Sequence, residues 1–167
     1  GWAVALQPDG KILLAGETMD FSSLGTALVR LNADGTLDPS FGIGGTLKTP
    51  GRGGKFAPAY AIKVQGDGKI IVAGWSQTAD QSTTDAFVYR YLSDGQLDTG
   101  FGVDGKVYID FNGSFDQVNA LVVQPDGKLV AGGFAFRSGG PARLAALFRL
   151  HDDGTFDASF GVAAQTP

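Results

Sequence analysis

The residues with the clearest chemical potential are aspartates spaced so that their oxygens could surround a cation. Residues 32–38 offer oxygen atoms from Asn, Asp, Thr and Asp side chains at alternate positions, as the loop of a calcium site does. The same stretch occurs twice more, and its first position becomes Leu92 and then His151, which are poor calcium ligands. An Asp-Gly turn accounts for all three stretches. The sequence therefore favours a structural turn over calcium and predicts no metal site.

Arginines recur inside apolar segments and are followed, eight residues later, by aspartates. The pairs are Arg30 with Asp38, Arg90 with Asp98, and Arg149 with Asp157. A partly buried guanidinium group needs carboxylate or carbonyl partners, because an unpaired charge is costly away from water. A residue that clamps a substrate would occur once, whereas these occur three times. The pattern therefore predicts structural Arg–Asp pairs within or between repeated units.

Catalytic groups are scarce in this sequence. His151 is the only histidine, lies in a turn, and would be the only base for a Ser-His-Asp arrangement. Paired carboxylates for glycoside hydrolysis could come from the many aspartates, but spacing along the chain does not fix their separation in space. The Gly-Arg-Gly-Gly-Lys segment at 51–55 lacks the Walker pattern of a phosphate-binding loop. The sequence therefore predicts no catalytic residue and no cofactor.

Aromatic residues are the best candidates for contact with a ligand. Trp75 and Phe134 occupy equivalent positions, and Phe136 and Arg137 lie close by in the sequence. Aromatic faces beside Arg, Asn, Asp and Gln side chains suit either a sugar or a protein partner. The alternative is that these rings cover the rim of a core or a seam between units.

A threefold internal repeat must position all of these residues. The block Gln-x-Asp-Gly-Lys begins at residues 7, 65 and 124, at steps of 58 and 59 residues. A second block, Asp-Gly-x-(Leu or Phe)-Asp followed by Phe-Gly, begins at 34, 94 and 153. The first block predicts tight turns at Asp9-Gly10, Asp67-Gly68 and Asp126-Gly127. A repeat of this length is typical of stacked copies of one supersecondary unit.

Each copy predicts a four-stranded antiparallel unit. Residues 3–6 and 11–15 form a hairpin around the first turn, and residues 26–31 form a third strand. A fourth strand lies within 36–41 or at 46–49. The third strand has apolar side chains on both faces, so its sheet must be packed on both sides, as in a propeller. We predict an all-β fold of three β-propeller blades at 1–58, 59–117 and 118–167, the last with a partial final strand; a β-solenoid is the weaker alternative.

These motifs resemble those of a known repeat family. Q-P-D-G-K-I-L-L-A-G followed by A-L-V-R-L-N-A-D-G-T-L-D-P-S-F-G resembles the delta-60 repeat, found in tandem in large bacterial proteins, and more distantly the blades of NHL-type propellers. The resemblance covers nearly the whole chain in three copies. It implies a β-propeller fold and an extracellular or periplasmic setting. It implies no defined activity, because such repeats share no catalytic motif.

The turns differ in how much they vary among the three copies. The turns at the Asp-Gly blocks hardly change, whereas the segments 17–25, 75–84, 134–143, 50–59 and 111–118 do. In a four-stranded meander the unchanging turns fall at one end of each blade, here called the constant end. The others fall at the opposite, variable end. A rigid framework with variable loops at one end is typical of a binding surface, although loops also vary where nothing constrains them.

Composition excludes several classes of partner. A net charge of −4 with only 13 Lys and Arg residues argues against nucleic acid, whose phosphates are bound by clustered cations. No apolar run reaches the 18 or so residues of a membrane span. The absence of cysteine excludes disulfides, Cys-ligated zinc and thiol catalysis. The first residues lack the pattern of a signal peptide, so an extracellular destination requires a signal outside this sequence.

Three blades are fewer than the four to eight that usually close a propeller. We therefore expect neighbouring blades, or a second copy forming a homodimer with a six-bladed ring, to cover the open edges. The predicted function is a binding or scaffold module that contacts a carbohydrate or protein through its variable end. The alternatives are part of a catalytic or calcium-dependent propeller enzyme whose site needs further blades, and a passive spacer.

Overall fold

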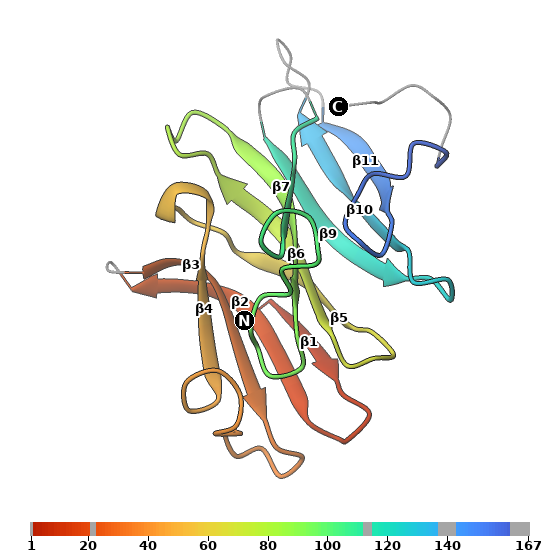
Figure 1. Ribbon diagram of the computed structural model, residues 1–167. Helices are drawn as coiled ribbons and strands as arrows, with labels where there is room; N and C mark the ends of the chain where they lie inside the picture. Colours follow the sequence, from red (N-terminus) through yellow and green to blue (C-terminus); the bar gives the residue numbers. More distant parts are fainter. Residues whose placement is uncertain (1, 21–22, 112–114, 137–142, 161–167) are drawn as a thin grey trace.

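Antiparallel strands make up most of the computed structural model, which describes residues 2–20, 23–111, 115–136 and 143–160 (Figure 1). The first sheet contains β1 (Ala3–Leu6), β2 (Ile12–Asp20), β3 (Ser23–Leu31) and β4 (Thr46–Pro50). The second contains β5 (Ala59–Val64), β6 (Ile70–Gln77), β7 (Thr84–Tyr91) and β8 (Lys106–Ile109). The third contains β9 (Asp116–Val123), β10 (Leu129–Phe136) and β11 (Arg143–Leu150). The predicted all-β fold of propeller blades is confirmed.

Each sheet is a meander in which consecutive strands pair with one another. One turn of 3-10 helix, η1 (Arg52–Gly54), lies in the connection from the first sheet to the second. The final strand expected for the third blade falls beyond residue 160, outside the described residues. Hereafter the three sheets with their turns are called blades 1, 2 and 3.

The turn between β1 and β2 shows why the Gln-x-Asp-Gly-Lys block recurs. Gln7 N–H donates to the Lys11 carbonyl at 2.8 Å, and Gly10 N–H donates to the Gln7 carbonyl at 3.0 Å. Gly10 has φ +84°, which strains any residue with a side chain. Asp9 Oδ1 accepts a hydrogen bond from Lys11 N–H at 3.2 Å. The same bonds recur at the Asp67-Gly68 and Asp126-Gly127 turns, so one turn is built three times.

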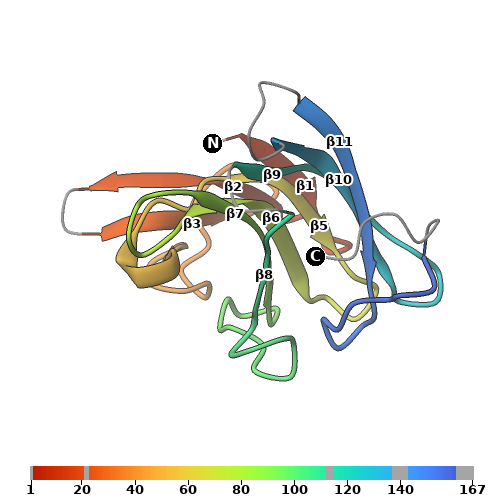
Figure 2. The ribbon, with the colours of Figure 1, turned by 90° about the horizontal axis from the view of Figure 1, so that it is seen from above.

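The three blades fan out from their first strands (Figure 2). β5 lies between β1 and β9 and contacts both. An apolar core lies between each pair of neighbouring blades. Leu13, Leu28, Phe41, Ile70, Phe87, Tyr89 and Tyr91 fill the first, while Ile71, Val88, Phe101, Leu121, Leu129, Phe148 and Leu150 fill the second. Blade 2 is therefore packed on both faces, as the apolar pattern of its strands requires.

Two predictions about local structure were wrong or incomplete. The segments 17–25, 75–84 and 134–143 were expected to be loops, but strands extend into all three: β2, β3, β6, β7, β10 and β11. Polar residues in these strand ends are half-buried, as Glu17 and Gln77 are, or buried and hydrogen-bonded, as Ser76 is to Arg52 N–H at 3.1 Å. The fourth strand of blade 1 is 46–50 rather than 36–41. The latter forms turns, with a bridge between Leu31 and Leu37 and backbone bonds such as Asp38 N–H to the Arg30 carbonyl at 3.0 Å.

Candidate functional site

Four aromatic rings converge at the variable end, where blades 2 and 3 meet. Phe115, just before β9, lies at their centre: its ring centroid is 5.6 Å from that of Trp75, 5.8 Å from Phe134 and 6.0 Å from Phe136. Phe115 and Phe134 are stacked with an interplanar angle of 8°, and Phe136 meets Phe134 edge to face at 5.8 Å. These offset and edge contacts are the arrangements that aromatic rings prefer. We call Trp75, Phe115, Phe134, Phe136 and Arg143 the aromatic cluster.

Arg143 supplies the cation of this cluster. Its guanidinium carbon lies 3.7 Å from the Phe134 ring centroid and 5.6 Å from that of Phe136, within the range of a cation–π interaction. Register explains the contact with Phe136, because Phe136 pairs directly with Arg143 across β10 and β11. Arg137, the cation proposed from the sequence, lies outside the described residues.

The structure brings Trp75, Phe134 and Phe136 together, but on strands rather than in loops. Trp75 lies on β6 opposite Ala86, and Phe134 lies on β10 opposite Ala145, so the small neighbours leave room for the rings. Phe134 is buried, Trp75 and Phe136 are half-buried, and Arg143 is exposed. The cluster is therefore both part of the seam between blades and accessible at its edge.

Sequence reasoning missed Phe115 and Arg143. Phe115 has a counterpart in Phe56, 59 residues earlier, and the two carbonyls accept equivalent hydrogen bonds, from Phe136 N–H at 3.0 Å and from Gln77 N–H at 2.9 Å; its segment was identified only as variable. Its position beside β7, shown by a bridge between Thr84 and Phe115, depends on how blade 3 packs on blade 2. A signal was available for Arg143, because a hairpin that places Phe136 opposite it would bring a cation over an aromatic ring.

A charged group lies at the same end of blade 2. The Arg52 guanidinium pairs with the Asp85 carboxylate, and Arg52 N–H donates to Ser76 Oγ at 3.1 Å. Asp116 Oδ2 accepts from Phe111 N–H at 2.7 Å. Burial raises the pKa of Asp116 to about 6, and the nearby charges of Asp110 and Asp85 add to this effect. Burial also raises the pKa of Asp85.

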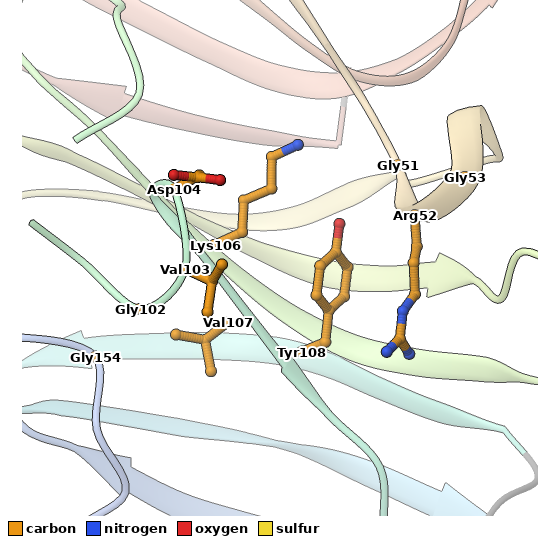
Figure 3. Close-up of a pocket in the computed structure, with 10 residues that line it drawn as sticks. All are labelled: Gly51, Arg52, Gly53, Gly102, Val103, Asp104, Lys106, Val107, Tyr108 and Gly154. Atoms are coloured by element: carbon orange, nitrogen blue, oxygen red, sulfur yellow. The ribbon is translucent and has the colours of Figure 1, made fainter. Parts of the chain in front are cut away.

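An open groove of about 680 Å³ runs along β8, the outer strand of blade 2 (Figure 3). Its polar lining includes Arg52, Asp104, Lys106 and Tyr108. Both cations already have partners, since Arg52 pairs with Asp85 and Lys106 Nζ donates to the Pro50 carbonyl at 3.4 Å. The groove could admit a ligand, but its cations would have to exchange internal contacts to bind an anion.

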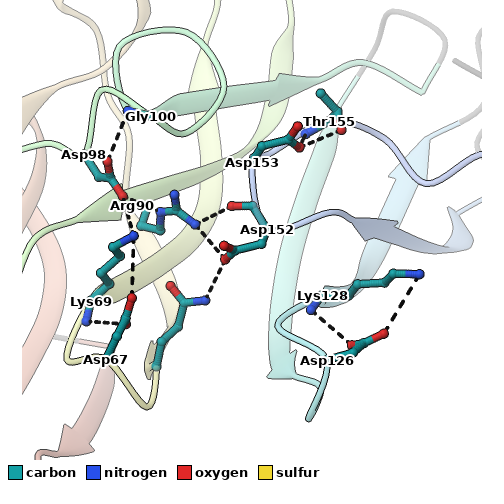
Figure 4. Close-up of polar contacts among 11 residues, drawn as sticks. Asp67, Lys69, Arg90, Asp98, Gly100, Asp126, Lys128, Asp152, Asp153 and Thr155 are labelled. Atoms are coloured by element: carbon teal, nitrogen blue, oxygen red, sulfur yellow. Dashed lines mark hydrogen bonds and ion pairs between the residues drawn. The ribbon is translucent and has the colours of Figure 1, made fainter.

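The recurring Arg–Asp pairs lie at the constant end. Arg30 Nε donates to Asp38 Oδ2 at 2.7 Å, and the equivalent bonds are 2.8 Å for Arg90 with Asp98 and 3.0 Å for Arg149 with Asp157. A lysine from the first block joins each pair: Lys11, Lys69 and Lys128 approach the same carboxylates to 3.0, 3.3 and 3.0 Å. Figure 4 shows this network around Arg90. The two sequence blocks of each repeat thus meet at one carboxylate.

These contacts lower the pKa of the three carboxyl groups. The hydroxyl of Ser40 and the ammonium of Lys11 hold the pKa of Asp38 well below its usual range, and Ser159 and Lys128 do the same for Asp157. Burial acts in the opposite direction on Asp98. Hydrogen bonds from Gly100 N–H and Lys69, with the charge of Arg90, outweigh it and lower the pKa of Asp98 as well.

The oxygens that resembled a calcium loop serve the turn itself. Asp34 Oδ1 accepts from Thr36 N–H at 3.0 Å and from the Thr36 hydroxyl at 2.7 Å, while Asp38 binds Arg30 and Ser40. Over the described ranges, no group of three or more His, Cys, Asp or Glu residues is placed to hold a metal ion.

His151 does not lie in the geometry of a catalytic triad. Its Nε2 is 3.9 Å from Asp157 Oδ1, and the Ser159 hydroxyl donates to the same oxygen at 2.5 Å. The carboxylate therefore stands between the serine and the histidine, whereas a triad requires the imidazole in the middle.

Stacked antiparallel blades, joined through repeated turns and apolar seams, define a β-propeller repeat protein. The chain belongs to the family described as "Domain of unknown function (DUF5122) beta-propeller", whose model matches residues 7–41, 65–101 and 124–160. Each match runs from the first block of a repeat to the Phe of its second block. A comparison with curated proteins gives no match. Within the described part of the chain, no helix has the length and apolar character needed to cross a membrane.

Proposed function

We propose that this chain is a binding module whose aromatic cluster contacts a carbohydrate or protein partner. The observation that supports this best is that Trp75, Phe115, Phe134 and Phe136 gather with Arg143 at the end of the blades where the copies differ. Half-buried rings with a cation at their edge offer an apolar face and hydrogen-bond donors together. That combination suits the faces and hydroxyls of a sugar or the centre of a protein interface.

The proposal includes the location of the module and the number of blades in the complete propeller. The resemblance to the delta-60 repeat supports an extracellular or periplasmic location. Three blades leave the two outer faces without a neighbouring sheet in the described structure. We therefore take the module to work within a larger propeller, completed by neighbouring blades or by a second copy.

The test is a glycan array together with pull-down from extracellular protein mixtures, followed by titration of any hit. Trp75→Ala should weaken binding about tenfold or more, as truncation of an aromatic residue at the centre of an interface does. Trp2→Ala is the matched control, because this exposed tryptophan lies on blade 1 and contacts Tyr60 at 5.5 Å, apart from the cluster. Equal affinities of Trp75→Ala and the unaltered chain would contradict the proposal.

A further inference from the structure

The two internal junctions between blades share the same polar contact. Arg30 of blade 1 donates from Nη1 to the Ser93 carbonyl of blade 2 at 2.5 Å. Arg90 of blade 2 repeats the contact on blade 3, where its Nη1 bonds the Asp152 carbonyl and, at 2.9 Å, Asp152 Oδ1 (Figure 4). The arginine that holds the aspartate of its own blade therefore also holds the Asp-Gly turn of the next one.

A second set of contacts, a backbone hydrogen bond and a close approach of glycine to Phe, places that turn against an aromatic ring. Gly42 N–H of blade 1 donates to the Asp94 carbonyl of blade 2 at 3.3 Å, and Gly102 N–H donates to the Asp153 carbonyl of blade 3 at 2.8 Å. A Cβ added to Gly95 would lie 2.9 Å from a ring carbon of Phe41. A Cβ added to Gly154 would likewise lie 3.1 Å from the ring of Phe101. Each turn glycine fits closely against the Phe-Gly corner of the preceding blade.

Blade 1 carries the half of this junction that accepts the hydrogen bonds, its Asp-Gly turn, and none of the described residues packs against it. Gly35 is equivalent to Gly95 and Gly154, yet a Cβ added there would meet no atom within 4 Å. The turn formed by Ala33, Asp34 and Gly35 is exposed. It contains the same backbone bond as its equivalents, since Gly35 N–H donates to the Asn32 carbonyl at 3.0 Å as Gly95 N–H does to Leu92 and Gly154 N–H to His151.

Blade 3 carries the other half of the junction, the arginine that in blades 1 and 2 donates hydrogen bonds to the following turn. The Arg149 side chain is 18% exposed, against 7% for Arg30 and 4% for Arg90. Its Nη1, the atom that reaches the next turn in the other blades, instead donates to Gln124 of its own blade at a long 3.4 Å. Phe160 is half-buried under Arg149, whereas Phe41 and Phe101 are fully buried.

The apolar faces follow the same division. Val4 of blade 1 is 65% exposed, although its equivalents Ile62 and Leu121 are buried against the preceding blade. Leu147 of blade 3 is 63% exposed, although its equivalents Leu28 and Val88 are buried against the following blade. The two outer faces are thus the two halves of the junction that the chain makes twice internally.

We propose that blade 3 of one copy docks on blade 1 of a second copy through this same junction. Arg149 would donate to the Ala33 carbonyl, Phe160 would lie against Gly35, and Leu147 and Val4 would enter a shared apolar seam. Two copies joined twice in this way give a ring of six blades, within the four to eight of known propellers. This rests on the proposed completion of the ring, with the second copy as its occupant, and is independent of any ligand.

The test uses complementary charges on the two faces. In Val4→Lys and in Leu147→Glu every junction of a homodimer contains a buried, unpaired charge, so each variant alone should be monomeric. Mixing them should restore the dimer, because one junction is then unaltered and the other pairs Lys with Glu. The measurement is mass in solution by analytical ultracentrifugation, expected at twice 17.3 kDa for the unaltered chain and for the mixture.

Val103→Lys is the matched control, since Val103 is 77% exposed even in the internal blade and should not enter a seam. Circular dichroism establishes that each variant is folded. A folded, unaltered chain with the mass of one copy, a dimer that persists in either variant alone, or a mixture that stays monomeric would overturn the proposal, as would a series of longer oligomers. Trp75→Ala should leave the mass unchanged, so failure of docking and failure of ligand binding are distinguishable.

Discussion

The constant and variable ends of the blades use carboxylates in opposite ways. At the constant end, Asp38, Asp98 and Asp157 each receive an arginine, a lysine and a turn N–H, and their pKa values are lowered. At the variable end, Asp85 and Asp116 are buried close to other acids, and their pKa values are raised. Contacts that recur three times favour the folded state at neutral pH. The contacts of Asp85 and Asp116 occur once in the chain, and the raised pKa values of these groups make their charge easier to change. Such a surface is suited to binding a ligand.

The strongest test of this contrast removes a constant-end arginine from an internal and from an outer blade. Arg90→Ala should lower the free energy of unfolding by about 3 kcal/mol or more, because it leaves Asp98 short of a partner and breaks the junction with blade 3. Arg149→Ala should cost about half as much, since Arg149 is more exposed and holds no following turn among the described residues. Urea unfolding followed by circular dichroism measures both. Equal losses would show that the contacts between blades contribute little.

At the variable end, Asp116→Asn should stabilise the protein at alkaline pH. The pKa of Asp116 is raised to about 6 from 3.8, so this group favours the folded state when protonated, and that contribution is lost as pH rises through 6. Asn cannot ionise and its carbonyl can still accept from Phe111 N–H. We expect a gain on the order of 2 kcal/mol at pH 8 and little difference at pH 4. Urea midpoints at the two pH values are compared, and an equal gain at both would contradict the burial argument.

The constant end should show the opposite pH dependence. Asp157 has a lowered pKa, so the stability it supplies is present above pH 4 and is lost as pH falls toward its folded-state value. Asp157→Asn should therefore be destabilising at pH 7 and nearly neutral in strong acid. Melting temperatures between pH 2 and 7 test this expectation. A variant that loses equal stability at every pH would point to packing instead of charge.

Trp75→Ala should be milder for stability than either arginine change. The ring is half-buried and, among the described residues, contacts one other aromatic ring, that of Phe115. We expect a loss of about 1 kcal/mol, below the cost of removing a fully buried aromatic side chain. Chemical unfolding of this variant beside Phe87→Ala, which opens the fully buried seam between blades 1 and 2, provides the comparison. A loss equal to that of Phe87→Ala would identify Trp75 as a core residue and weaken its proposed role in binding.

Calcium should have the smallest effect of all. Asp34 Oδ1 already accepts a hydrogen bond from Thr36, and the two carboxylate oxygens of Asp38 accept from Ser40 and Arg30. Adding calcium should leave the melting temperature unchanged, because a ligand stabilises only the state that binds it. A rise that depends on calcium concentration and disappears in Asp34→Asn would show a site that the turn geometry conceals.

Much of the constant end could be predicted from the sequence, because each structural interpretation could be compared among the three copies. Arg30 with Asp38 is a weak clue alone, but two further pairs at the same spacing made a structural role the better interpretation. The lysine in each network was missed, since Lys11 and Asp38 meet only when two different turns come together. The aromatic cluster was half predicted. The repeat aligns Trp75 with Phe134, and it also aligns Phe115 with Phe56. The contact of Phe115 with Trp75 depends on packing between blades, which no local pattern encodes.

The Arg–turn contacts described above connect each blade only to its immediate neighbours, which has a consequence for folding cooperativity. Stability in such an array is a sum of blade terms and nearest-neighbour terms, as in other repeat proteins. In the described part of the chain, blade 2 has two seams and blades 1 and 3 have one each. Amide exchange should therefore be slowest in β6 and β7 and faster in β2 and β11. Joining the two outer faces would give the amides of all blades equal protection from exchange. Unfolding would then occur in a single cooperative transition instead of blade by blade.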